Sequence, residues 1–317
     1  MAGVLVLLIV PVVAVAVLVL VGALVVAGGL GAQRTGLHRG ALLARWAGLL
    51  LGLLMVGMVV SIGASGFPAS GPLAYGALAA VGPAAGGLVL VLAIAGGELT
   101  LPAPRSAVRR ASLRRRTAGD LVPRRAVVLC AVVVGVLVLL TAVSTVLATE
   151  GRFYATVDLL EGGGILETVS SPFPGAQYTL PIWGGLLVLA VAAALALRVI
   201  LRRRPSDDVQ DILLRRRSLT SVLGAPVLAA SLTLLPVAAL MGMQLLPSAG
   251  HAATGVELAC IVLSGVGVVV GLLALPVGLV MVVFPEVIAR KGAPRDERPP
   301  EAVVDGSDVA EMQGERR

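Results

Sequence analysis

Few residues in this chain have the types and spacing that catalysis or metal binding requires. The two histidines, His38 and His251, fall in polar connections at opposite ends of the apolar segments, so they cannot share a metal ion or a haem. Thr141, Ser144 and Thr145 are spaced i, i+3 and i+4 and could line a site, but hydroxyl groups in apolar helices usually bond to their own backbone or to a neighbouring helix. No HExxH, CxxC, EF-hand, P-loop or GxSxG pattern is present. The sequence therefore predicts no catalytic residue, no metal site and no cofactor.

Acidic residues at the borders of apolar segments are the next candidates. Glu98 stands between an apolar run and a stretch dense in arginines, and we take Glu98, Arg109 and Arg110 as a candidate interfacial charge site, able to bind a cation or form ion pairs. Glu257 borders a later apolar run. For both carboxylates the alternative is a hydrated side chain, because only a charge inside an apolar segment indicates function by default.

Long apolar segments must position these residues. Of the 317 residues, 57% are hydrophobic and only 14% charged, and the mean hydropathy of +0.99 exceeds what a soluble domain buries in one core. Apolar runs of about 18 or more residues recur, each long enough to cross a bilayer as a helix. The predicted fold is all-α, a polytopic transmembrane helical bundle over residues 1–285, followed by a polar tail, 286–317, whose composition predicts disorder. About seven spans are predicted, over residues 3–30, 47–64, 73–94, 126–148, 182–201, 219–246 and 258–284.

The basic residues predict the orientation of these spans. Of the 25 Lys and Arg residues, all except Arg152 fall on alternate connections, in residues 31–46, 98–125 and 198–218 and in the tail. The positive-inside rule then places the N-terminus outside the cytoplasm and the C-terminus inside it. Because the arginines stand in short runs beside apolar segments, the net charge of +7 indicates contact with a lipid bilayer that has anionic headgroups at its inner face, and no nucleic acid.

Two shorter patterns predict local structure. In residues 206–218 acidic residues come first and arginines last, an order that suits the helix dipole and predicts a short interfacial helix. Glycine pairs at spacing four permit neighbouring helices to approach closely. These pairs are Gly48 with Gly52, Gly82 with Gly86, and Gly267 with Gly271.

The outer connection, residues 149–181, is the longest between two spans and carries aromatic and acidic side chains. Long connections of this kind are often functional, so Tyr154, Glu167, Phe173 and Tyr178 are candidate recognition residues. The apolar residues of this connection predict that it docks over the helix ends as a cap, with residues 162–164 as a hinge. The alternative is a connector that satisfies only its own backbone.

Three short motifs lie between the third and the sixth predicted spans. They are Gly97-Glu98-Leu99-Thr100 followed by Pro102 and Pro104, Pro172-Phe173-Pro174-Gly175 with Tyr178 and Pro181, and Leu214-Arg215-Arg216-Arg217-Ser218. In these motifs the chain resembles an uncharacterised family of actinobacterial multi-pass integral membrane proteins. The resemblance implies a location in the bacterial plasma membrane and brings no activity with it.

Three functions remain open at this stage. The first is a non-catalytic accessory or scaffold protein with a membrane protein partner of unknown identity. The second is a permease for a small or apolar solute, which could use a helix interrupted by Pro226 and Pro236. The third is a membrane-embedded lipid-modifying enzyme. A polar cavity at mid-membrane lined by Ser231, Thr233 or Gln244 would favour transport, and a solid core would favour the scaffold.

Overall fold

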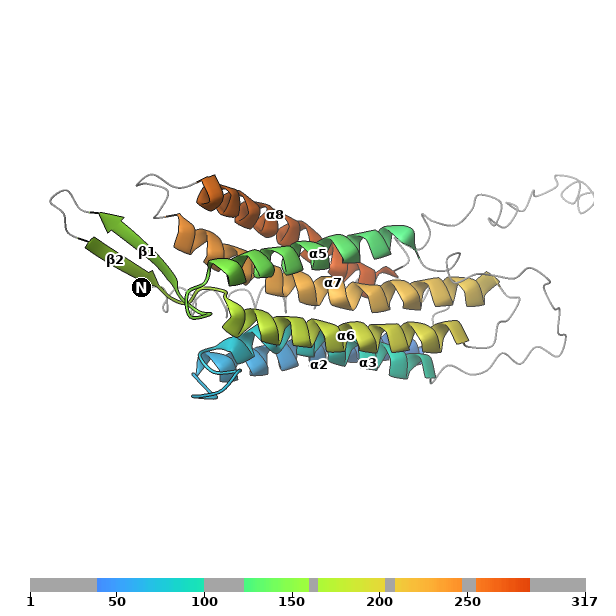
Figure 1. Ribbon diagram of the computed structural model, residues 1–317. Helices are drawn as coiled ribbons and strands as arrows, with labels where there is room; N and C mark the ends of the chain where they lie inside the picture. The colour runs from blue at the N-terminus through green and yellow to red at the C-terminus, as the bar shows by residue number, and fades with distance from the viewer. Residues whose placement is uncertain (1–38, 100–122, 160–164, 203–208, 247–254, 286–317) are drawn as a thin grey trace, which may run out of the picture.

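A computed structural model describes residues 39–99, 123–159, 165–202, 209–246 and 255–285 of the chain. The helices lie side by side in a bundle, and a two-stranded hairpin extends from one end (Figure 1). The elements in chain order are α2 (Arg39–Ala64), α3 (Ala77–Leu99), α5 (Arg124–Leu147), β1 (Tyr154–Leu159), β2 (Ile165–Ser170), α6 (Ala176–Arg202), α7 (Val209–Leu245) and α8 (Gly255–Val283).

Within the described residues, six helices are long and apolar enough to cross a membrane. They coincide with the last six of the predicted spans, so the chain is a multi-pass integral membrane protein, and the all-α prediction is confirmed for the bundle. The predicted span over 3–30 and the tail over 286–317 lie outside the described residues. Among the described helices, all except α2 and α5 contain proline and continue through it, since neighbouring helices can satisfy the carbonyl that each proline leaves free.

The prediction of a separate interfacial helix over 206–218 is wrong. Residues from Val209 onward belong to α7, which runs without a break to Leu245. No proline or glycine occurs between Val209 and Leu223, so nothing in the sequence ends the first turns before the membrane span begins. The acidic-to-basic order describes the first turns of a long helix instead of a short one.

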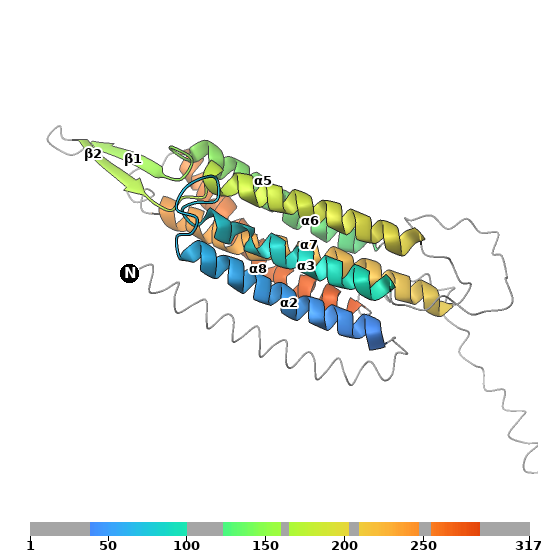
Figure 2. The same ribbon diagram turned by 90° about the horizontal axis from the view of Figure 1, so that it is seen from below.

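Helix α7 lies at the centre of the bundle and packs against α3, α5, α6 and α8, whereas α2 packs chiefly against α3. Two apolar clusters fill the interior. One joins α5, α7 and α8 through residues such as Leu137, Leu234 and Met281, and the other joins α3, α6 and α7 through residues that include Ile94 and Leu219. Seen from below in Figure 2, α2 and α3 run together along one side of the bundle. A polar group on α7 is therefore placed to reach several other helices.

Glycines bring α2 and α3 into backbone contact. A methyl group at Gly52 would lie 2.8 Å from the carbonyl oxygen of Gly86, and one at Gly86 would lie 2.6 Å from the carbonyl oxygen of Gly52. A methyl at Gly48 would lie 2.5 Å from the Cβ of Ala93. The predicted role of these glycine pairs in close helix approach is confirmed here, because a larger residue would push the two helices apart.

We predict that Gly52→Ala destabilises the bundle by about 1–3 kcal/mol, since its methyl group meets backbone atoms that cannot turn aside. Gly57→Ala on the same helix is the control, because nothing lies within 4 Å of its methyl group. Alanine also favours a helix over glycine by about 1 kcal/mol, so the control is neutral or slightly stabilised. Thermal unfolding of the purified variants measures both effects, and equal Tm values would contradict the close approach.

Strands β1 and β2 form an antiparallel hairpin in which Tyr154 pairs with Ser170 and Leu159 with Ile165. Figure 1 shows the hairpin projecting beyond the ends of the helices, so the prediction that this segment lies over them as a cap is wrong for the hairpin. The strands pair along their facing edges, so the hairpin forms without lying on a helix surface. The predicted hinge over 162–164 lies outside the described residues.

Candidate functional site

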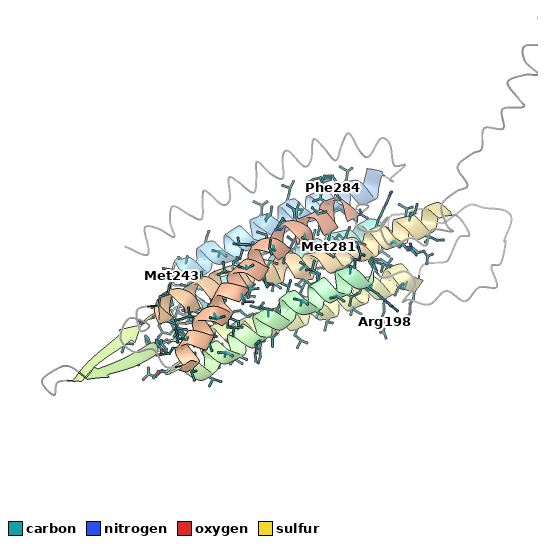
Figure 3. All side chains as sticks on the ribbon, turned by 90° about the horizontal axis from the view of Figure 1, so that it is seen from above. Arg198, Met243, Met281 and Phe284 are labelled. Atoms are coloured by element: carbon teal, nitrogen blue, oxygen red, sulfur yellow. The ribbon has the colours of Figure 1, made fainter. Side chains whose placement is uncertain are left out.

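The two ends of the bundle carry different polar side chains. We call the end where α2, α5 and α7 begin and α3, α6 and α8 finish the arginine end, and the opposite one the hairpin end. Arg124 and Arg125 at the start of α5, and Arg198 and Arg202 of α6, are exposed at the arginine end. Figure 3 shows Arg198 pointing away from the bundle. Other charged groups at this end point inward.

Three inward-pointing residues at the arginine end join three helices. Arg45 of α2, Glu98 of α3 and Ser218 of α7 are 6%, 8% and 1% exposed. The Arg45 guanidinium donates from Nη2 to Ser218 Oγ over 3.2 Å, and Ser218 Oγ donates to Oε1 of Glu98. We call this set of three residues the Ser218 bridge.

The hydroxyl of Ser218 has one proton to donate. The backbone carbonyl of Leu214 lies 3.1 Å away as a competing acceptor, but a carboxylate accepts a stronger hydrogen bond than a neutral carbonyl. The proton therefore points to Glu98, which leaves the lone pairs of Ser218 to accept from Arg45. This arrangement compensates the cost of burying a carboxylate and a guanidinium, which is several kcal/mol per ion for unpaired charges.

The first turns of α7 reinforce this end of the bundle. Arg215, Arg216 and Arg217 are all buried, although each is long and charged. Thr220 and Ser221 donate hydrogen bonds to the carbonyls of Arg216 and Arg217, and Ser221 also reaches Val282 of α8 over 3.3 Å. The start of α7 is thus bonded to α2, α3 and α8, and its arginine stems contribute apolar packing.

The Ser218 bridge was only partly predictable. The sequence singled out Glu98 and expected Arg109 and Arg110 beside it, but both arginines lie outside the described residues. The structure places Glu98 with Ser218, 120 residues away, and Ser218 with Arg45, 173 residues away. Each of the three residues borders a different predicted span, and in each case at the end that the positive-inside rule assigns to the same side of the membrane. The sequence therefore places them at a similar depth, but no local pattern indicates that they contact one another.

At the hairpin end an aromatic pair fixes the base of the hairpin. Tyr154, the first residue of β1, donates from its hydroxyl to Oε1 of Glu257 in the first turn of α8 over 2.6 Å. Its ring stacks on Phe173, with the ring centroids 5.3 Å apart, and Phe173 is fully buried. Glu257 thus accepts a hydrogen bond from the chain itself, and the hairpin is tied to the bundle where it begins and just after it ends.

A second group of contacts ties the connection between α2 and α3 to the same region. The Arg152 guanidinium lies 4.2 Å from the centroid of the Tyr75 ring and 4.5 Å from that of Phe153, within the range of a cation–π interaction. The Tyr178 hydroxyl donates to the carbonyl of Tyr75 over 2.9 Å. The Gln177 amide adds longer contacts to backbone carbonyls of the same connection.

Hydroxyl groups join α5 to α6 near the hairpin end. Thr141 donates to the carbonyl of Leu137 and accepts a 3.0 Å hydrogen bond from Trp183 Nε1. Ser144 donates to the carbonyl of Pro174, which precedes α6. Thr145 Oγ1 lies 2.8 Å from Thr179 Oγ1. The prediction that these hydroxyls bond to their own backbone or to a neighbouring helix is confirmed.

The four candidate recognition residues have different places in the structure. Tyr154 and Phe173 are buried against each other, and Tyr178 holds the connection between α2 and α3. Glu167 is in β2, and its side chain lies outside the described residues. Recognition by these residues stays a prediction, but two of the four face the interior of the protein and would act on a partner only by holding the hairpin.

Metal ligands do not gather in the described part of the chain. Among those residues no group of three or more His, Cys, Asp or Glu side chains is close enough to hold a metal ion. His38 and His251 lie outside it. Of the two free cysteines, Cys260 is buried and Cys130 half-buried.

Comparison with known proteins adds no assignment. No family model, no curated protein and no solved structure matches the chain. The function must therefore be argued from the chain's own geometry.

We predict that Ser218→Ala destabilises the protein by about 1–3 kcal/mol, because it removes the hydroxyl between two buried charged groups. Ser231→Ala is the control: Ser231 is also buried in α7, but its hydroxyl donates to the carbonyl of Val227 in the same helix. Thermal unfolding in detergent measures the difference. A Tm for Ser218→Ala that equals that of the control would show that the bridge contributes nothing.

Proposed function

We propose that the chain is a non-catalytic accessory or scaffold protein of the membrane that presents the β1–β2 hairpin to a partner. The observation that carries this proposal is the contrast between the base of the hairpin and its strands. The base is fixed by Tyr154, Phe173 and Glu257, whereas the strands project beyond the helices (Figure 1). An element held firmly at its base and extended into the surroundings is suited to contact another molecule.

The chemistry of a two-stranded sheet indicates how such contact is made. Each outer edge has backbone N–H and C=O groups that can pair with an added strand. A hairpin alone in water is marginally stable at best, so it benefits both from an anchored base and from a third strand. Val169 of β2 is 54% exposed, which leaves an apolar side chain available to the same partner. The proposed partner therefore offers an extended peptide segment.

The interior of the bundle supports a static role. The hydroxyls of Ser231 and Thr233, which the permease alternative would place along a solute path, donate to the carbonyls of Val227 and Ala229 in their own helix. The hydroxyls of α5, which a lipid-modifying enzyme would draw on, are engaged in contacts between α5 and α6 and within α5. These contacts favour a scaffold over the other two functions.

The proposal includes an orientation. The arginine end faces the cytoplasm of a bacterial cell and the hairpin faces outward across the plasma membrane. Support comes from the positive-inside rule and from the resemblance to actinobacterial membrane proteins. An outward-facing hairpin meets extracytoplasmic segments of other membrane proteins.

We predict that replacing residues 156–168 with a Gly-Ser linker of equal length abolishes partner contact without preventing membrane insertion, because Tyr154 and Phe173 remain in place. A photoreactive residue at position 169 reports the contact: it should form a discrete protein adduct in cells, and the adduct should disappear when the linker replaces the strands. The control carries the photoreactive residue at Val146, an exposed residue near the hairpin end of α5.

Two further readouts accompany the adduct. Val169→Cys, in a background without Cys130 and Cys260, should react with a membrane-impermeant thiol reagent added outside the cell. The proposal is wrong if the linker variant inserts normally and fully rescues the phenotype of a deletion strain.

A further inference from the structure

The two outer edges of the hairpin differ at its base. Thr149 and Phe153 form a bridge in which the backbone N–H of each residue donates to the carbonyl of the other, over 2.8 Å and 3.0 Å. This bridge lies on the side of β1 that faces away from β2, because the carbonyl of the preceding residue, Arg152, accepts from Phe173 on the β2 side. The chain itself therefore occupies the start of the outer edge of β1.

The alternation of backbone groups identifies which residues face outward along both edges. In an antiparallel pair, successive residues point their N–H and C=O groups alternately toward the partner strand and away from it. Because Phe153 pairs outward, every second residue after it faces outward too, as does its partner in the register. The cross-strand pairs with outward groups are Ala155 with Val169, Val157 with Glu167, and Leu159 with Ile165.

The outer edge of β2 is open. Among the described residues, no strand or bridge pairs with this edge. Ser171, the residue that follows β2, is exposed, so the chain does not fold back over the base of β2 as Thr149 does at β1. A strand added along β2 therefore meets no obstacle from the described part of the chain.

We propose that the outer edge of β2 binds the partner, and that the partner segment is extended and basic. This inference rests on the proposed function and adds to it the edge that binds and the charge of what it binds. An extended segment matches a row of N–H and C=O groups on alternate residues, as in other cases of strand addition. The side chain of Val169 is 54% exposed on this strand and supplies an apolar contact.

The charge of the hairpin indicates a basic segment. Residues 154–170 contain Asp158, Glu161 and Glu167 and no Lys, Arg or His. The nearest basic residue in the sequence, Arg152, is engaged in cation–π contacts. Complementary charge speeds the encounter of two partners and suppresses wrong ones. Pairing of two copies along this edge would bring like charges together, so a second copy is disfavoured.

Single prolines on the two edges separate them in a binding test. Val169→Pro removes an N–H that points away from β1 and keeps the ladder between the strands, and edge strands tolerate proline at such positions. Ala155→Pro, directly opposite in the register, removes the equivalent N–H of the other edge and is the matched control.

The purified full chain, in nanodiscs of phosphatidylcholine, is titrated with a fluorescent peptide of alternating Lys and Thr and with one of alternating Glu and Thr. Only binding that the linker over residues 156–168 abolishes is counted, because the arginine end can attract the acidic peptide.

We expect the wild type and Ala155→Pro to bind the Lys-Thr peptide equally. Val169→Pro should bind it roughly tenfold more weakly, because the ring removes a donor and obstructs the added strand. The proposal is overturned if Ala155→Pro loses as much affinity as Val169→Pro, if the Glu-Thr peptide binds the hairpin equally, or if the wild type does not bind the Lys-Thr peptide. A dimer of the wild type that Val169→Pro dissociates would also overturn it, because the edge would then serve a second copy.

A cellular experiment separates failure of this inference from failure of the proposed function. The photoreactive residue is moved to position 171, where Ser171 is exposed. Its adduct should persist in Ala155→Pro and disappear in Val169→Pro. If the adduct persists in both variants and still disappears with the linker, the edge is wrong although the hairpin serves a partner. If no adduct forms at position 169 or 171, the proposed function fails and this inference fails with it.

Discussion

Burial of charge at the arginine end is the constraint on which the arrangement of the bundle depends. A carboxylate and a guanidinium withdrawn from water are tolerated only if each finds a partner with good geometry. Arg45, Ser218 and Glu98 meet this requirement from three helices that are far apart in the sequence. Helices α2, α3 and α7 must therefore reach this layer in one register. A shift of α7 by one residue would turn the Ser218 hydroxyl by about a quarter of a turn and break both hydrogen bonds.

The middle and the hairpin end of the bundle depend on other interactions. Between the ends, α2 and α3 are held by backbone contact at Gly52 and Gly86, and the buried hydroxyls of α7 bond within their own helix. At the hairpin end, aromatic rings and single hydrogen bonds tie the connections to α6 and α8. Specific polar chemistry thus concentrates at the two ends, which are the parts that headgroups and partners meet, while the lipid-facing middle supplies apolar packing.

Sequence patterns predicted the helices better than the contacts between them. The length of an apolar run is visible in the sequence, and six of the seven predicted spans are confirmed as helices in the described residues. The spacing of glycines within α2 and within α3 predicted that neighbouring helices approach closely, as they do at Gly52 and Gly86. The pattern failed where polar residues continue a helix: α6 begins at Ala176 and α7 at Val209, ahead of their apolar runs. It also missed the hairpin, although Thr156, Val157, Thr168 and Val169 are β-branched and stand on either side of a glycine-rich stretch of sequence. The contacts of the Ser218 bridge could not be predicted from the sequence, because residues 120 or 173 positions apart leave no periodic pattern that would pair them.

A double-mutant cycle between Arg45→Gln and Glu98→Gln tests the central role of the bridge most directly. Free energies of unfolding are measured for the wild type, both single variants and the double variant, with the cycle of Glu98→Gln and Arg202→Gln as a control for residues that share no partner. If the bridge couples α2 to α3 through Ser218, the first cycle gives an interaction energy of about 1–3 kcal/mol and the control cycle is additive. Additivity within about 0.5 kcal/mol in the first cycle would contradict the account, because residues that share no interaction behave in that way.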